Sequence, residues 1–218
     1  MKTILILSGG LDSTCLLYEL KKMGDEIICL NFQYGSKHNA RELSAARHTV
    51  DEINIPLKVL NLQFITHLFK SALLFNGEDV PEGHYAAENM KKTVVPFRNA
   101  IMLSIAGGYA ASIGANRIAA GIHAGDHTIY PDCRVEFFDS FKDLLRVGLW
   151  EKVDFYAPYL WLNKGDIARR GYDAGAPVYL TYSCYKGGLI HCGKCGACAE
   201  RKEALGTLNR KDETVYVE

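Results

Sequence analysis

The chain has 218 residues and carries 25 basic and 25 acidic side chains, so its formal net charge is zero. Apolar residues make up 48% of the chain, enough to bury a sizeable core, and no apolar run is long enough to span a membrane. Without a net positive field, nucleic-acid binding is not expected to be the main activity. The first residues lack the pattern of a secretory signal, so we expect a cytoplasmic protein.

Short apolar strands alternate with helices along most of the chain. The predicted strands are Thr3–Leu7, Glu26–Phe32, Leu57–Leu62 and Arg117–Ile122. The predicted helices are Ser13–Met23, Asn39–Ile53, Asn99–Ile113 and Val135–Trp150, and the segment 64–90 is expected to be a loop-rich lid. This alternation predicts an α/β fold with a doubly wound parallel sheet, in which ligands bind at the carboxyl ends of the strands.

The composition changes after Pro177, where cysteine, glycine and lysine become frequent. We therefore predict an α/β domain over residues 1–178. A small four-cysteine module follows over residues 179–218, packed on the first domain and not independent of it.

The first predicted strand ends in the stretch SGGLDST, residues 8–14. The backbone N–H groups of its glycine turn and of the following helix start form a concave surface that suits a phosphate. Asp12 stands where a P-loop would have a lysine, and a carboxylate beside a phosphate is favourable if Mg²⁺ bridges them. The alternative is a plain strand–helix turn, capped by serine or aspartate and holding no ligand.

Four cysteines lie close together near the end of the chain: Cys184, Cys192, Cys195 and Cys198. Their spacing, with Gly193 and Gly196 between them, lets a tight turn close around an ion. This pattern predicts a closed tetrahedral zinc site with a structural role. The alternatives are an iron–sulfur cluster, a persulfide-carrying site or four unrelated thiols.

Five polar stretches follow the predicted strands and are expected to converge on one crevice. They are YGSKH (34–38), VVPFRN (94–99), GIHAGDHTIYPDCRVEF (121–137), PYLWLNKGDI (158–167) and TYSCYKG (181–187). Positive charge for phosphates is expected from Lys37, His38, Arg98 and Lys164. Carboxylates are expected from Asp126, Asp132 and Glu136, and a carboxylate that accepts two protons matches a guanine-like edge. Taken singly, each of these residues has a structural alternative as a helix cap or a salt-bridge partner.

The turn SGGLDS resembles the signature of the PP-loop ATP pyrophosphatases, which adenylate a substrate and release pyrophosphate. Over nearly the whole chain, SGGLDST, YGSKH, VPFRN, YPDCR, PYLWLNK and SCY with CGKCGAC, in this order, resemble the 7-cyano-7-deazaguanine synthases. That resemblance implies ATP-dependent conversion of 7-carboxy-7-deazaguanine and ammonia to the nitrile, preQ0. The reaction passes through an adenylated acid and an amide, on the route to queuosine and related 7-deazapurines.

The resemblance also implies cofactors, partners and site residues. ATP, with Mg²⁺, is expected on Leu7, Ser8, Gly9, Gly10, Leu11, Asp12, Ser13, Thr14, Cys15, Leu16 and Leu17. One Zn²⁺ is expected on the four clustered cysteines. The candidate catalytic residues are Asp12, Lys37, Arg98, Asp126, Asp132, Arg134 and Lys164. The expected protein is a homodimer that takes small-molecule substrates and has no direct nucleic-acid or membrane partner.

One segment departs from the commoner family pattern. His123 and His127 stand where that pattern has glutamate and phenylalanine, next to the predicted substrate pocket. Two other outcomes therefore stay open, a reaction that stops at the amide and an acyl transfer to another amine. A tRNA sulfurtransferase and a nucleotide sensor without turnover are further alternatives. We interpret Cys133 as a packing or substrate-contact residue in preference to a covalent nucleophile.

Overall fold

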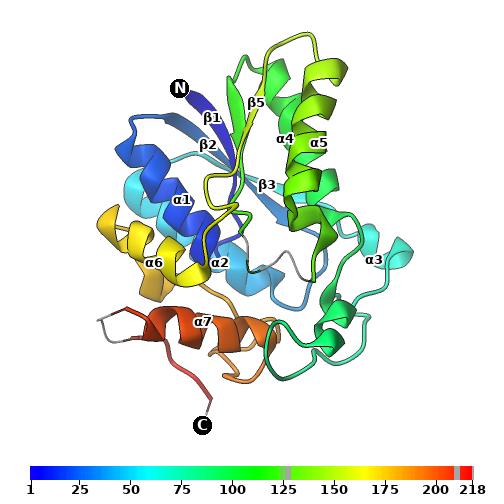
Figure 1. Ribbon diagram of the computed structural model, residues 1–218, viewed down its shortest axis with the longest axis vertical. Coiled ribbons are helices and arrows are strands. Elements are labelled where there is room, and N and C mark those ends of the chain that lie inside the picture. The colour runs from blue at the N-terminus through cyan, green and yellow to red at the C-terminus, as the bar shows by residue number, and fades with distance from the viewer. Residues whose placement is uncertain (124, 126–128, 209–211, 218) are drawn as a thin grey trace.

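A computed structural model describes residues 1–123, 125, 129–208 and 212–217. Five strands form one parallel sheet in the order β3–β2–β1–β4–β5 (Figure 1). The strands are β1 (Lys2–Ile6), β2 (Glu26–Gln33), β3 (Leu57–Asn61), β4 (Arg117–Ala119) and β5 (Asp154–Tyr156). The predicted α/β fold with a parallel sheet is confirmed.

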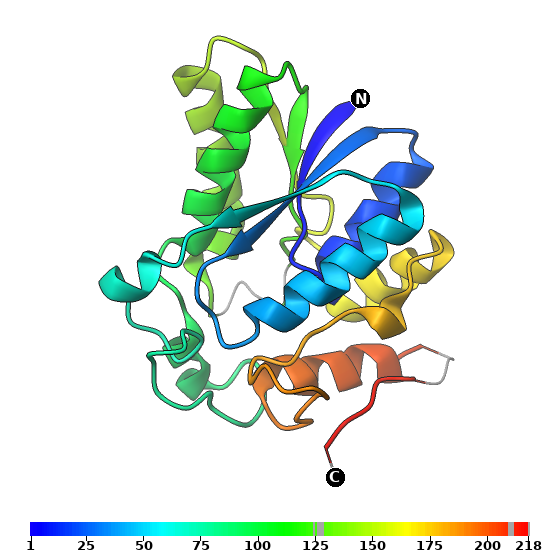
Figure 2. The same cartoon turned by 180° about the vertical axis from the view of Figure 1, so that it is seen from behind.

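Helices cover both faces of the sheet, as the opposite views in Figures 1 and 2 show. One layer holds α1 (Leu11–Lys22), α2 (Asn39–Ile53) and α6 (Lys164–Asp173), and the other holds α4 (Arg98–Ser112) and α5 (Val135–Gly148). The remaining helices are α3 (Ile65–Leu68), α7 (Gly196–Gly206) and the 3₁₀ turns η1 (Glu88–Thr93), η3 (Pro131–Cys133) and η4 (Val178–Leu180). The sheet is therefore doubly wound.

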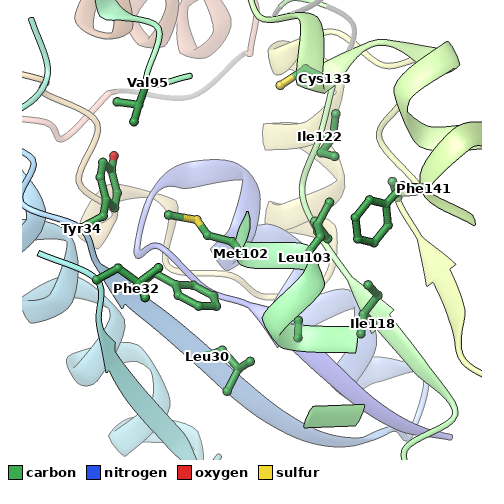
Figure 3. Packing of buried hydrophobic residues seen from close by; sticks show 14 of the residues in the cluster. Leu30, Phe32, Tyr34, Val95, Met102, Leu103, Ile118, Ile122, Cys133 and Phe141 are labelled. Atoms are coloured by element: carbon green, nitrogen blue, oxygen red, sulfur yellow. The ribbon is translucent and has the colours of Figure 1, made fainter. Parts of the chain in front are cut away.

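Successive strand residues serve opposite cores, because side chains alternate across a strand. In β1, Ile4 packs with the layer of α4 and α5, whereas Leu5 packs with the layer of α1. Ile118 and Ala119 of β4 divide in the same way. Figure 3 shows the first core, in which Leu103 comes from α4. Buried on both faces, these strands need the unbroken apolar runs that their sequences contain.

The order of the strands places a crevice at the centre of the sheet. The chain runs from β1 to β2 and β3 on one side, and then crosses to β4 and β5 on the other side. Where the strand order reverses in this way, the loops after the two central strands diverge and leave room for a ligand. Residues 7–10, after β1, and residues 120–122, after β4, therefore face the same crevice.

Three elements of the structure are not predicted by the sequence pattern. The strand β5 has three residues and only Phe155 is buried, so it is too short to show a period. The helix α6 lies in a stretch predicted as a polar loop, and its start is capped by Asn163, whose side chain accepts a hydrogen bond from the N–H of Asp166. The helix α7 begins within the cysteine module, with Cys195 at its N-cap. The predicted strand at 117–122 ends early, at Ala119.

The cysteine module is packed into the rest of the molecule. Its Cys184 and Cys198 belong to the same buried cluster as α4, and Leu205 of α7 belongs to the cluster of α1. The division of the chain at residue 178 stays a prediction, as does the role of the mostly irregular segment 64–90 as a lid. Among the helices that the structure describes, none combines the length and the hydrophobicity that a membrane crossing requires.

A close contact between α1 and α6 offers a test of this packing. A Cβ atom on Gly171 would lie 2.1 Å from Sγ of Cys15 and 2.9 Å from its Cβ, so the two helices would have to separate. Gly171→Ala should therefore lower the free energy of unfolding by about 1–3 kcal/mol, measured by urea denaturation. The control is Gly108→Ala in α4, where the added Cβ meets nothing within 4 Å. That variant should match or exceed wild type, and equal values for the two variants would contradict the packing argument.

Candidate active site

The turn between β1 and α1 is rigid before any ligand binds. Gly9 has a φ of +97°, and a Cβ atom on it would lie 2.1 Å from the carbonyl oxygen of Glu42 in α2, so only glycine fits. The hydroxyl of Ser13 accepts a hydrogen bond from the N–H of Ser8 and donates one to the carbonyl of Gly10, at 3.2 and 3.3 Å. A fixed glycine turn at a helix start is the arrangement that binds phosphate.

Asp12, the second residue of α1, places a carboxylate at the edge of this turn. Its Oδ2 lies 3.5 Å from Nζ of Lys164 and 3.6 Å from Nε2 of His123. Its Oδ1 is buried and has no hydrogen-bond partner among the residues described. A buried carboxylate oxygen left open beside a phosphate-binding turn fits a Mg²⁺ ligand. The residues present therefore fit the divalent cation that the sequence predicts.

Lys164 belongs to a cluster of charged side chains that reaches the cysteine module. Its Nζ lies 2.5 Å from Oε2 of Glu200, a buried residue of α7. The other carboxylate oxygen of Glu200 lies 3.9 Å from Nε2 of His123. We call Asp12, His123, Lys164 and Glu200 the charged cluster. It connects the phosphate turn to α6, to the loop after β4 and to α7.

The turn opens into a cavity of about 210 Å³. Both helical layers contribute to its wall, together with the loops after β1, β2 and β4. Its apolar part contains Phe32, Tyr34, Met102, Leu103, Ile122 and Cys133, all labelled in Figure 3. Its charged part contains Asp12, Glu42, Arg98 and Lys164. Apolar walls with a few convergent charged groups are typical of small-molecule sites.

Arg98 places a second positive charge in the cavity, from the helical layer opposite Lys164. It is the first residue of α4, and its Nη1 donates a hydrogen bond of 3.0 Å to the phenolic oxygen of Tyr34. The guanidinium carbon also lies 5.5 Å from the centre of the Tyr34 ring. Two cations on opposite walls suit a ligand, or a pair of ligands, with two separate anionic groups.

Two titratable residues of α2 and its N-cap also line the cavity. Burial and the charge of Arg98 lower the pKa of His38 to about 4, so the expectation of a positive charge at His38 is wrong. Burial raises the pKa of Glu42 to about 8, although Arg98 acts in the opposite direction. Oε2 of Glu42 lies 3.7 Å from Nε2 of His38. The sequence offers one signal for Glu42, a spacing of four residues from His38 on one helix.

The predicted ATP-binding residues divide into two groups. The cavity is lined by Leu7, Ser8, Gly10, Leu11, Asp12 and Ser13. Gly9 supports the turn from behind, against α2. The side chains of Cys15, Leu16 and Leu17 are fully buried in the core between α1 and the sheet. The first half of the segment faces the cavity, and the second half anchors the helix.

Lys37 does not line the cavity. Its ammonium donates hydrogen bonds to the carbonyl oxygens of Ala72, Gly77 and Glu78, at 3.0, 3.3 and 2.5 Å. With three acceptors already in place, this side chain tethers the segment 72–78 to the start of α2. The geometry gives no support to its predicted contact with phosphates.

Three further candidates follow β4. Oδ2 of Asp132 accepts a hydrogen bond of 2.9 Å from the N–H of Asn99 and so caps α4, outside the cavity lining. Arg134 is exposed at the N-cap of α5, also outside the lining. Cys133 does line the cavity, and its sulfur accepts a hydrogen bond of 3.3 Å from Nδ2 of Asn99. Asp126 lies outside the described residues.

The four predicted metal ligands come together. The sulfur atoms of Cys184, Cys192, Cys195 and Cys198 all lie within 4.8 Å of one another. The backbone N–H groups of Cys192 and Cys195 donate to the sulfurs of Cys184 and Cys192, each at 3.3 Å. Such donors favour thiolates, and four thiolates are the donor set of a closed zinc site. The residues present can therefore hold a metal ion.

The sheet order, the glycine turn after its first strand and the charged cavity define the PP-loop class of ATP pyrophosphatases. Two solved structures share this fold. One, from Methanocaldococcus jannaschii and described as a predicted subunit of tRNA methyltransferase, has a TM-score of 0.51 at 16% identity, over 79% of this chain and 74% of that one. The other, a 4-thiouridine synthetase with RNA and ATP, has a TM-score of 0.51 at 18% identity, over 80% and 40%.

Within this class, the chain matches the family model described as queuosine biosynthesis protein QueC, over residues 2–209. A 7-cyano-7-deazaguanine synthase from Porphyromonas gingivalis is 49% identical, over 98% of this chain and 96% of its own length. Relatives of the same name from Caldicellulosiruptor bescii and Methanoregula boonei are 45% and 46% identical, each over 99% of this chain and over 97% and 99% of their own lengths. The chain belongs to the QueC family, and the resemblance inferred from its motifs is confirmed.

The raised pKa of Glu42 predicts a pH-dependent cost of keeping this carboxyl in the cavity. The groups that face it are His38, Arg98 and Tyr34, and its pKa is about 8 in the fold against an ordinary 4.5. Folding therefore favours the protonated form, and this contribution is complete below pH 4.5 and is lost as the pH rises through 8.

Glu42→Gln should remove this cost. We expect nearly equal free energies of unfolding for variant and wild type at pH 4.5, and a variant more stable by about 2–4 kcal/mol at pH 9. Urea denaturation across this range measures the difference. Glu52→Gln, at the exposed end of the same helix, is the control and should follow wild type. A difference for Glu42→Gln that does not change with pH would contradict the shifted pKa.

Proposed function

We propose that this protein catalyses the ATP-dependent conversion of 7-carboxy-7-deazaguanine and ammonia to 7-cyano-7-deazaguanine, through an adenylated acid and an amide. The observation that carries the proposal is the cavity at the switch point of the sheet. There the phosphate turn, Lys164 and Arg98 meet in a chain that belongs to the QueC family. The similarity to relatives of that name, over nearly their full lengths, supports the same reaction.

The two positively charged walls of the cavity suggest that each wall binds a different reactant. A carboxylate is a poor electrophile, so the acid must first be adenylated. One oxygen of its carboxylate attacks the α-phosphate of ATP, and pyrophosphate leaves. The turn and Lys164 bind the phosphates. Asp12 would hold Mg²⁺, which would supply neutralising charge when bound. Arg98, on the opposite wall, binds the carboxylate of the acid and orients it for attack. The apolar walls exclude water, which would otherwise hydrolyse the activated acid.

Other parts of the proposal rest on the sequence. We propose that the carboxylate of Asp126 recognises the guanine-like edge by accepting hydrogen bonds from its two N–H groups. We assign Zn²⁺ to the four cysteines, with a structural role. A homodimer and a cytoplasmic location complete the proposal.

The central test is the fate of the acid. The protein should convert 7-carboxy-7-deazaguanine, ammonium and Mg-ATP to the nitrile, with AMP and pyrophosphate released, as followed by mass spectrometry. Asp12→Ala should fold normally and lose at least about 10²-fold in turnover, because it removes the cation ligand beside the phosphates. Asp51→Ala, an exposed residue of α2, is the matched control and should keep wild-type turnover.

Each product has a distinct meaning. Accumulation of the amide without nitrile would show that the reaction stops after one activation. Incorporation of another amine would show acyl transfer. Near-normal turnover of a well-folded Asp12→Ala variant would overturn the assignment of this residue to the cation.

The cysteine cluster gives a second test. Metal analysis of the purified protein should find one zinc per chain and no visible absorption from iron and sulfide. Cys195→Ser should lose the metal and lower the melting temperature, because metal binding at such sites is coupled to folding. Cys133→Ser, a cysteine outside the cluster, should keep its zinc. Iron with labile sulfide would instead favour the sulfurtransferase alternative.

A further inference from the structure

The carboxyl group of Glu42 stands beside the phosphate turn. Glu42 lines the cavity, and 16% of its side chain is exposed. Its Oε1 lies 3.9 Å from the position that a Cβ atom would take on Gly10, at the N-cap of α1. Within the part of the chain that the structure describes, no residue donates a hydrogen bond to this carboxyl. Nε2 of His38 lies 3.7 Å from its Oε2.

The position of this carboxyl opposes the charge of the site. In its ionised form, which predominates above about pH 8, this carboxyl raises the energy of phosphate bound at the turn, unless a cation or a strong N–H donor lies between them. His38 cannot supply that charge, because burial and Arg98 lower its pKa to about 4. A ligand that carries its own N–H donors and positive charge would satisfy Glu42.

The proposed reaction contains one such ligand. The nitrogen donor is present near neutral pH mainly as ammonium, which has no lone pair with which to attack. It must bind next to the acyl phosphate, and so next to the phosphate turn, and it must give up a proton there. We propose that Glu42 forms the ammonium site of the enzyme and accepts the first proton from the incoming nitrogen. This assignment rests on the proposed function.

Ammonium binds to the ionised form of Glu42 and favours it by charge attraction. The bound ammonium then transfers one proton to the Glu42 carboxylate, which becomes a carboxylic acid. The freed lone pair forms the C–N bond at the acyl carbon, and the bond from that carbon to the oxygen of AMP breaks. AMP leaves with that electron pair, and the surplus proton on the nitrogen passes to its phosphate. The raised pKa of Glu42, about 8, suits a group that must hold a proton for part of the cycle.

Asp12 is the other carboxylic acid among the described residues of the lining. It already lies within 3.6 Å of Lys164 and His123, and its open oxygen fits a metal ion. Glu42 is therefore the carboxyl with capacity left for a proton.

The experiment separates the amine step from the activation step. Acid-dependent exchange of labelled pyrophosphate into ATP, without ammonium, measures activation, and product formation measures the amine step. In Glu42→Gln, kcat/KM for ammonium should fall by about 10²-fold, mostly through KM, whereas the exchange rate should fall far less. Hydroxylamine is neutral near pH 7, because its conjugate acid is much stronger than ammonium. The variant should therefore use hydroxylamine nearly as well as wild type does.

Two further variants complete the design. Glu42→Asp keeps a carboxylate and should recover part of the ammonium rate, whereas Glu52→Gln should match wild type. Equal losses with ammonium and hydroxylamine, or unchanged ammonium kinetics in Glu42→Gln, would overturn the ammonium site while leaving the proposed function standing. Absence of acid-dependent exchange in wild type would overturn the proposed function, and the ammonium site with it.

Discussion

The contact between Gly9 and the backbone of α2 is the constraint on which the site depends. Because a Cβ atom would lie 2.1 Å from the carbonyl oxygen of Glu42, β1, α1 and α2 can approach this closely only through a glycine. The same contact sets the shape of the phosphate turn and the start of α1. It also places the first turn of α2 at the cavity, so the Glu42 carboxyl lies beside the phosphate turn. One backbone contact thus positions groups from three elements.

The charged cluster extends this arrangement to the end of the chain. Glu200 follows Cys198 by two residues, on the helix that begins in the cysteine module. Its ion pair with Lys164 connects that module to the phosphate turn. Lys164 also lies 3.5 Å from the carboxylate of Asp12. Arg201, the next residue, is fully buried and donates to the carbonyl of Val178 and the hydroxyl of Thr181. A metal ion held by the four cysteines would therefore be connected to the proposed active site through short ionic contacts.

The two helical layers contribute different chemistry to one cavity. The layer of α1 and α6 supplies the start of the phosphate turn's helix, Asp12 and Lys164, whereas the layer of α4 supplies Arg98 and the apolar side chains of Met102 and Leu103. A doubly wound sheet allows this, because its central crevice is open to both faces. This arrangement supports the separate binding of the two anionic reactants that we propose.

Local patterns determined much of this protein from the sequence alone. Unbroken apolar runs mark strands buried on both faces, and two-residue cysteine spacing marks a thiolate cluster, because each depends on neighbours along the chain. The phosphate turn is equally local. Arg98 and Lys164 could also be predicted, since polar residues after parallel strands meet at one edge of the sheet.

The tertiary structure decided how the remaining polar residues are used. Lys37 and Asp132 have the right type and position in the sequence, yet one tethers a loop and the other caps a helix, because acceptors and donors from distant segments reach them first. His38 loses its expected charge only through burial beside Arg98. Glu42 has only its four-residue spacing from His38 as a local sign of function, and Glu200 lies in a helix without such a sign. Their roles arise from contacts with residues 32 and 36 positions away along the chain, and such contacts exist only once the chain has folded.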